Sequence, residues 1–240
     1  MHSFSRLRIV AAAVSIATMQ GAVAASGQQL SSAEVVRQID AAVKARVDGI
    51  AGYTVNEHYA VFRNKDQSHP VAEMTVKTDY RQDTGKSYTI LSQTGSDLIR
   101  SVVLNAILDN EKQLNLPGTR EGSWITSANY DMKLKTNATE QVGGRDCLVL
   151  SLSPRRKAPF LIEGTLWVDA KNYSIVQLQG SSSKSPSVFT GPTKMMRQYR
   201  DVNGFSEATH ARAVSNSFLF GETVVTIDYA DYQMRLVPGK

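Results

Sequence analysis

Residues 194–214 read KMMRQYRDVNGFSEATHARAV, and this stretch carries the clearest fold signal in the chain. Asn203-Gly204 is a dipeptide preferred in two-residue hairpin turns, because both positions of such a turn adopt a positive φ. The flanking residues 194–200 and 205–214 have the length and composition of single strands. The stretch therefore predicts two antiparallel strands joined by a tight turn.

Alternation of apolar and polar residues predicts further strands on both sides of this hairpin. One apolar face, interrupted by Glu57, comprises Tyr53, Val55, Tyr59 and Val61. In the following segment, 72–80, Met74 and Val76 alternate with charged neighbours. The remaining predicted strands are 87–93, 130–139, 145–153, 160–168, 174–178 and 224–234. Short turns between them favour one antiparallel meander.

Two segments have the apolar period of helices instead. Ser31 and Glu34 form a capping-box pattern at the start of the first helix, which Gly49 is expected to end. The second helix begins near Ser96, contains an apolar stripe that includes Leu98 and Val102, and ends before residues 117–118. The sequence thus predicts a mostly β, α+β fold with a single antiparallel sheet.

The amino terminus has the pattern of a secretory signal peptide. Arg6 and Arg8 precede a short apolar run, and Ala22-Val23-Ala24 is a suitable cleavage site. We expect residues 1–24 to be removed and residues 25–240 to form one domain. Cys147, the single cysteine, lies far from the cleavage point, so lipidation there is not expected. No later apolar run reaches the ~20 residues of a transmembrane helix, and the expected location is the periplasm.

Charge and motifs exclude several functions. The formal net charge is +5, and removal of Arg6 and Arg8 with the leader lowers it to +3, which is too weak and dispersed to indicate nucleic acid. The S-x-x-K match at 181–184 lies in a serine run rather than at a helix start. His58, His69 and His210 lack metal-ligand spacing. We therefore expect neither an enzyme nor a bound metal or cofactor.

A basic run, Arg155-Arg156-Lys157, follows Pro154 in a predicted turn. A solvated hairpin tip is the simpler interpretation. The alternative is a docking point for an acidic partner or for anionic lipid head groups. Cys147 lies in an apolar strand and is expected to be a buried, slowly reacting thiol.

Two segments carry a family resemblance. Residues 142–154, VGGRDCLVLSLSP, resemble a characteristic strand of the LolA/LolB-like superfamily of outer-membrane lipoprotein-sorting proteins and their relatives. Residues 164–176, GTLWVDAKNYSIV, are similar to the tryptophan hairpin that follows it in that superfamily. The resemblance implies an unclosed half β-barrel with two or three covering helices and an apolar cavity that accepts acyl chains. The superfamily's aspartate-glycine-lysine strand is replaced by Lys77-Thr78-Asp79, so no ligand-binding residue carries over directly.

On this basis the expected function is a periplasmic binding or transfer protein for an acylated ligand, a lipid or a lipoprotein. The alternative is an envelope-stress sensor or regulatory module of the same fold, which would bind a protein. Its partner could be an inner- or outer-membrane protein. Strand alternation and the helical stripe give five candidate cavity residues, namely Met74, Val76, Leu98, Val102 and Leu166.

Overall fold

The computed structural model describes residues 31–136, 138–185, 191–217 and 221–239. The predicted signal peptide, 1–24, lies outside the described residues, as does the end of the serine-rich patch after residue 185. The single-domain assignment of residues 25–240 stays a prediction.

Five helical segments lie in the described residues: α1 (Ser32–Gly49), α2 (Asp97–Ile99), the π-helix η1 (Arg100–Asn105), α3 (Ala106–Leu114) and the 3₁₀-helix η2 (Arg120–Ser123). The first strands are β1 (Ile50–Arg63), β2 (Ala72–Arg81), β3 (Gly85–Gly95), β4 (Tyr130–Leu134), β5 (Glu140–Val142) and β6 (Arg145–Pro154). The later strands are β7 (Ile162–Asp169), β8 (Ile175–Ser182), β9 (Lys194–Val202), β10 (Phe205–Ser217) and β11 (Gly221–Leu236).

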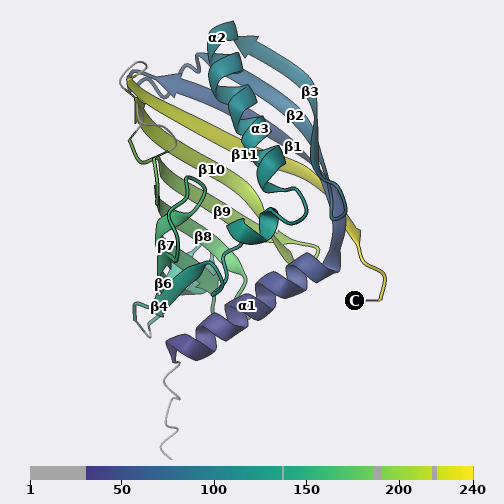
Figure 1. Cartoon of the computed structure of the whole chain (residues 1–240), viewed down its shortest axis with the longest axis vertical. Coiled ribbons are helices and arrows are strands. Elements are labelled where there is room, and N and C mark those ends of the chain that lie inside the picture. Colours follow the sequence, from purple (N-terminus) through teal and green to yellow (C-terminus); the bar gives the residue numbers. More distant parts are fainter. Residues whose placement is uncertain (1–30, 137, 186–190, 218–220, 240) are drawn as a thin grey trace, which may run out of the picture.

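All these strands belong to one antiparallel sheet of 11 strands, with the order β3-β2-β1-β11-β10-β9-β8-β7-β6-β4 and β5 added beside β6 (Figure 1). The edge strands β3 and β4 are not paired with each other in the described part of the chain, so the sheet is an unclosed half-barrel. The predicted fold class is confirmed. The hairpin predicted for residues 194–214 is β9–β10, and its turn has a positive φ at Asn203 and Gly204.

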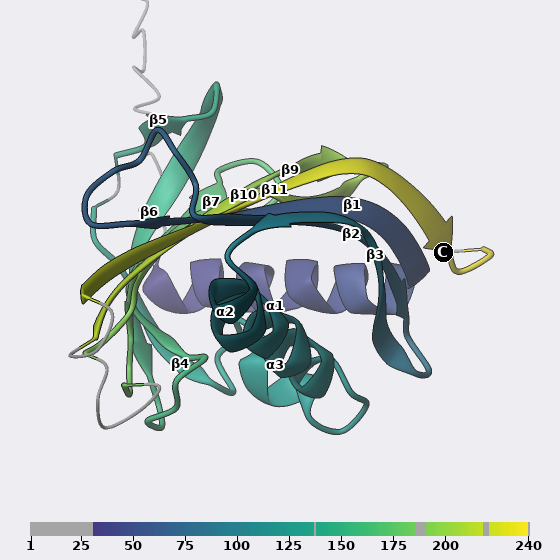
Figure 2. The same cartoon turned by 90° about the horizontal axis from the view of Figure 1, so that it is seen from above.

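Both long helical segments lie on the concave side of this sheet (Figure 2). Helix α1 begins as its sequence predicts, because Ser31 caps it and accepts a hydrogen bond of 3.1 Å from the backbone N–H of Glu34. Its buried residues Val35 and Ile39 pack into a core with strands β4, β6 and β7. Helix α1 therefore covers the half of the sheet that contains the hairpin of residues 164–176, which β7 and β8 form.

The second predicted helix is present, but it consists of α2, η1 and α3 in succession. Ser96 caps it as expected and accepts a hydrogen bond from the N–H of Ile99. The π-helical turns in the middle shift the inward face, so that Ile99, Leu104 and Leu108 become the buried residues. Such π-helical turns are rare and often occur at functional sites.

One predicted strand is divided into two in the structure. The expected strand 130–139 is found as two short strands, β4 and β5. Leu134 pairs with Leu150, whereas Glu140 pairs with Cys147, so the chain between them has more residues than the facing part of β6. The strands β4 and β5 therefore pair with β6 in different registers, and the register rather than local propensity determines this break.

Cys147 lies in β6 with no exposed surface, and burial raises the pKa of its thiol. We expect an aqueous disulfide reagent to label it slowly in the native protein at neutral pH, because the thiolate is the reactive species. Urea should make labelling fast. The check is the labelling rate with and without denaturant, and equally fast labelling in both conditions would contradict the buried position.

Candidate functional site

A cavity of about 1120 Å³ lies between the concave face of the sheet and the covering helices. Its wall includes residues of α1, of η1 and α3, and inward residues of β1, β3 and β8 to β11. The cavity is larger than the ~300–1,000 Å³ typical of small-ligand pockets. Space of this size would be filled by side chains in a closed core, so the half-barrel is hollow between its two packed ends.

Strand alternation determines which side chains reach this cavity. On β9, Met195, Arg197 and Tyr199 lie on the wall, while the intervening residues belong to the opposite face of the sheet. On β11, Val225 and Tyr229 lie on the wall in the same way. The sheet side of the cavity therefore combines apolar groups with phenol rings and one guanidinium.

The helical side contributes apolar surface. Val102 and Val103 of η1 and Ile107 of α3 lie on the wall. Val102 is 47% exposed even though it belongs to a helix that covers the sheet. Much of the surface of this wall residue is therefore accessible to solvent.

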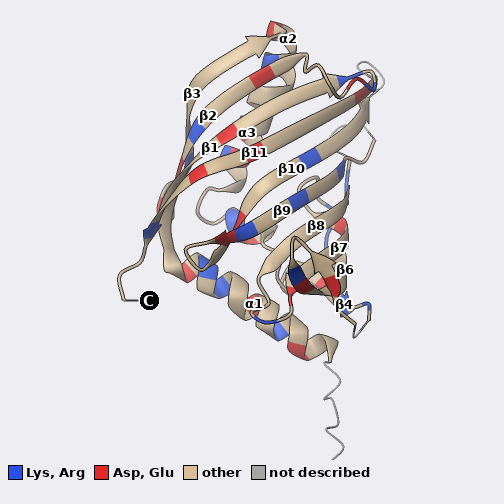
Figure 3. Cartoon of the chain, turned by 180° about the vertical axis from the view of Figure 1, so that it is seen from behind, with Lys and Arg blue, Asp and Glu red and all other residues tan. Residues whose placement is uncertain are grey.

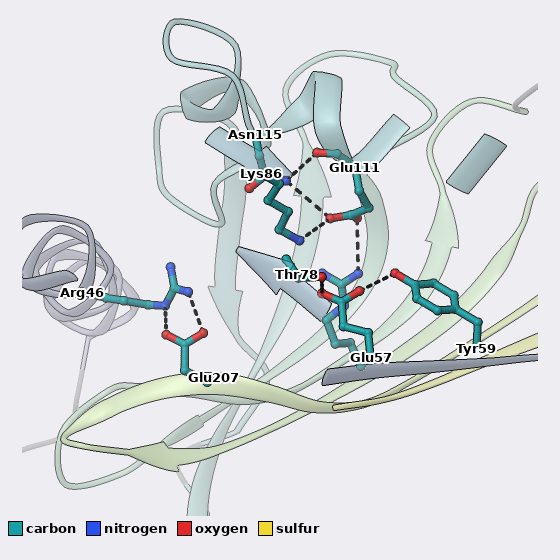
Figure 4. A network of polar contacts seen from close by, with 9 residues as sticks. Arg46, Glu57, Tyr59, Thr78, Lys86, Glu111, Asn115 and Glu207 are labelled. Carbon is teal, nitrogen blue, oxygen red and sulfur yellow. Dashed lines mark hydrogen bonds and ion pairs between the residues drawn. The ribbon is translucent and has the colours of Figure 1, made fainter. Parts of the chain in front are cut away.

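An ion cluster joins the second helical segment to both halves of the sheet. The Nζ of Lys86 on β3 lies 2.9 Å from Oε2 of Glu111 on α3, and a guanidinium nitrogen of Arg197 on β9 lies 3.8 Å from Oε1 of the same carboxylate (Lys86 and Glu111 are labelled in Figure 4). Asn115 donates a further hydrogen bond of 2.7 Å to the backbone carbonyl of Glu111. Glu111 is thus the shared anion of two cations.

The pKa values of this cluster follow from its geometry. Lys86 is the main reason that the pKa of Glu111 falls to about 2, although burial opposes the shift. Burial by itself would lower the pKa of Lys86, but the carboxylate of Glu111, together with further neighbours such as Glu57, outweighs burial and holds that pKa well above its ordinary value. Both groups are therefore charged across the physiological pH range.

The residue that interrupts the apolar face of β1 proves to be a buried carboxylate. Glu57 is 2% exposed, and its two oxygens accept hydrogen bonds from the hydroxyls of Tyr59 and Thr78 (Figure 4). The Thr78 bond measures 2.8 Å. Burial, followed by the charge of Glu57, raises the pKa of Tyr59, so this phenol remains a donor. These bonds offset much of the cost of burying the polar group.

A second ion pair attaches α1 to the sheet. Arg46 donates to both carboxylate oxygens of Glu207 on β10, at 2.9 Å and 2.8 Å, and to the carbonyl of Ser206 (Figure 4). The Glu207 side chain is only 3% exposed. Burial acts to lower the pKa of Arg46, and Glu207 raises it by more. This two-pronged pair fixes the carboxyl-terminal half of α1 over the cavity.

The five predicted cavity residues lie in three different environments. Met74 and Val76 are fully buried in the core beneath α2, η1 and α3. Leu166 is fully buried in the other core, beneath α1. Leu98 is 60% exposed on α2, and Val102 belongs to the cavity wall. Their contact with a ligand stays a prediction, which the placement favours for Val102 and does not favour for the other four, since these are not among the residues that line the cavity.

The basic run 155–157 is engaged in contacts within the chain. Arg155 lies 2.8 Å from Asp131, and Lys157 lies 3.5 Å from Glu163. Arg156 donates a hydrogen bond of 2.8 Å to Asn129. The outer face of the sheet carries scattered charges of both signs (Figure 3). Docking of a partner at this run stays a prediction.

The sequence interpretation missed Lys86, Glu111 and Arg197 as site residues. A signal was present for Arg197, because it occupies the middle of the alternating set Met195, Arg197 and Tyr199, where an apolar residue is expected. For Lys86 and Glu111 no local signal existed, since both have the ordinary spacing of surface charges. Their pairing depends on how α3 lies over the sheet.

Within the described ranges, no group of three or more His, Cys, Asp or Glu side chains is arranged to hold a metal ion. None of the helices in the described residues is both long and apolar enough to cross a membrane. The site is thus a large cavity with an apolar helical wall and an ion cluster at the sheet.

No protein-family model matches the sequence, and no curated protein matches it. Solved structures do. A LolA superfamily protein from Nitrosomonas europaea is 14% identical, with a TM-score of 0.44, over 87% of this chain and 96% of that one. A DUF1329 family protein from Desulfovibrio piger is 16% identical, with a TM-score of 0.42, over 86% and 94%.

A third solved structure is a domain from Vibrio parahaemolyticus described as an outer membrane lipoprotein-sorting protein. It is 13% identical, with a TM-score of 0.45, over 87% of this chain and 94% of that chain.

Proposed function

We propose that this chain is a periplasmic binding or transfer protein that holds the acyl chain of a lipid or lipoprotein between its sheet and its helices. The observation that carries the proposal is the cavity of about 1120 Å³, lined along η1 by apolar side chains, of which Val102 is 47% exposed. The role is binding and release without covalent chemistry.

The energetics suit a reversible carrier. Burial of a hydrocarbon chain yields ~0.8 kcal/mol per methylene group, or roughly 10 kcal/mol gross for a long acyl chain. Loss of motional freedom on binding offsets a large part of this gain. An open wall such as that beside Val102 lets the chain enter and leave without unfolding the sheet, which transfer between membranes requires.

The direct test is to purify the full chain from cells and analyse an organic extract by mass spectrometry. We expect lipid to be present in the extract, and delipidated protein to bind the fluorescent fatty acid cis-parinaric acid. A protein without lipid that binds neither this probe nor its methyl ester would overturn the proposal. Capture of one regulatory protein by such a lipid-free chain would favour the alternative sensor function instead.

Val102 and Leu98 provide a matched pair of variants for binding. Val102→Asn places an amide on the cavity wall, where burial beside an acyl chain leaves it without a partner, so probe affinity should fall about tenfold. Leu98→Asn changes an exposed residue of the same helical segment and should leave affinity within about twofold. Fluorescence titration with methyl parinarate measures both. Equal effects of the two substitutions would contradict entry of the ligand beside η1.

A further inference from the structure

We propose that Arg197 binds the anionic head group of the ligand inside the cavity, so that the cargo is a carboxylate- or phosphate-bearing amphiphile whose head group enters the half-barrel. The inference rests on the proposed function and specifies its ligand. It assigns a polar recognition site to β9, opposite the apolar wall of η1.

The side chain of Arg197 is partly exposed. Its side chain is 32% exposed although it points to the concave face, so the exposed part belongs to the cavity. Lys86, the other cation of the cluster, is 10% exposed and lies 2.9 Å from Glu111. Arg197 lies 3.8 Å from that carboxylate, which is longer than a hydrogen bond. A guanidinium has five N–H donors, so Arg197 keeps donors for an incoming anion.

The charges within the cluster of Lys86, Glu111 and Arg197 do not cancel. Glu111 neutralises one of the two cations, Lys86 and Arg197, and leaves one positive charge in this cluster. Arg46 occupies both oxygens of Glu207, and hydroxyl groups occupy both oxygens of Glu57. The cations and carboxylates of the wall balance in number, so the attraction of an anion depends on the local position of Arg197, which lies 3.8 Å from its nearest carboxylate in the cluster.

Two tyrosines lie near the guanidinium of Arg197. Tyr229 and Tyr199 lie close enough to Arg197 to interact with its guanidinium, and Tyr199 is also a side-chain hydrogen-bond partner of Arg197. Both rings belong to the cavity wall. Burial raises the pKa of Tyr229, so its phenol keeps its proton and can donate to an anion beside Arg197. A carboxylate here would receive charge-assisted hydrogen bonds, which are the strong ones.

Apolar wall residues provide surface for the hydrocarbon tail. Met195 lies two residues from Arg197 on the same face of β9 and is also a wall residue. Val225 of β11 and Val102 of η1 extend the apolar wall on either side of the cavity. A ligand with its head group at Arg197 thus has apolar surface available for its chain.

The test compares cis-parinaric acid with its methyl ester, which has the same hydrocarbon chain and no charge. Wild-type protein should bind the acid about tenfold to a hundredfold more tightly than the ester, as expected for hydrogen bonds to a charged group. Arg197→Gln should remove this preference by weakening the acid and leaving the ester unchanged. Arg200→Gln is the matched control, since Arg200 is an exposed residue of the same strand on the opposite face.

Three results would overturn the inference while leaving the proposed function intact: equal wild-type affinity for acid and ester, an equal loss of both probes in Arg197→Gln, or an equal effect of Arg200→Gln. The wild-type comparison needs no variant and holds even if Arg197→Gln fails to fold.

Displacement of the acid by palmitate or by palmitoyl lysophosphatidate then identifies a carboxylate or a phosphate as the preferred head group. Displacement by neither contradicts an anion site. Failure of both probes to bind would instead count against the acyl-carrier function itself.

Discussion

Replacement of Leu166 by alanine is expected to lower the free energy of unfolding by about 2–5 kcal/mol. Leu166 has no exposed surface and packs in the core that α1 forms with β4, β6 and β7. Truncation leaves a void that the surrounding strands cannot fill, because their register fixes the backbone on both sides. Urea unfolding followed by circular dichroism measures the loss.

Leu98→Ala is the control for this substitution, since it removes the same atoms from a residue that is 60% exposed. Its effect on stability should stay within about 0.5 kcal/mol. A small loss at Leu166, comparable to that at Leu98, would mean that the core beneath α1 is hollow and that the ligand cavity extends there. Probe binding by Leu166→Ala should remain close to that of the wild type once the protein is folded.

The second large effect is expected for Lys86→Met, which should destabilise the fold by about 3 kcal/mol, the lower end for a broken buried ion pair. Lys86 is 10% exposed and is the nearer cation of Glu111. Its removal leaves that carboxylate with Arg197 at 3.8 Å as its remaining cation in the cluster. The lower end applies because the Glu111 side chain is 26% exposed to the cavity. Urea unfolding at neutral pH provides the measurement.

The double variant Lys86→Met/Glu111→Leu is the control, and it should recover part of the lost stability, because the unpaired carboxylate is gone while Arg197, which loses its anion in the cluster, is 32% exposed to solvent. Failure of the second substitution to recover any stability would show that Lys86 acts by packing, with no role for the ion pair.

Acid adds an independent readout for the same pair. The pKa of Glu111 is lowered in the folded protein from 4.5 to about 2, chiefly by Lys86. A depressed carboxyl pKa stabilises the fold above its unfolded value, so this contribution is lost as the pH falls from about 4.5 to about 2. In Lys86→Met the folded pKa of Glu111 rises, and this part of the acid dependence should shrink. An unchanged acid profile in the variant would contradict the assignment.

The sequence predicted the strands well because their signal is local. The turn at Asn203-Gly204 and the alternation around Met74 need no knowledge of distant residues. The start of both helices was equally local, since Ser31 and Ser96 cap them as expected. The π-helical turns of η1 were not predictable, because an apolar stripe of ordinary helical spacing runs through them.

The cavity wall was the harder part for a physical reason. Alternation identifies the two faces of a strand, but it does not show whether a face meets a packed core or a hollow. Met74 and Leu166 have the same pattern as Met195, and only the positions of the helices over the sheet separate them. The charged wall residues could not be identified from local sequence for a similar reason, because Lys86, Glu111 and Arg197 come together from distant segments.

The strand order has a consequence for the biosynthesis of the chain. Strand β1, near the amino terminus, lies between β2 and β11, and Tyr59 pairs with Ile227 near the other end of the sequence. A chain that emerges amino-terminus first can form β1–β3 and the meander β4–β10 early, but these two halves cannot join before β11 emerges. Closure of so long a loop is slow, and until then β1 and β10 present unpaired edges that invite aggregation. A holdase chaperone that covers these edges would therefore matter most during the interval before the last strand is delivered.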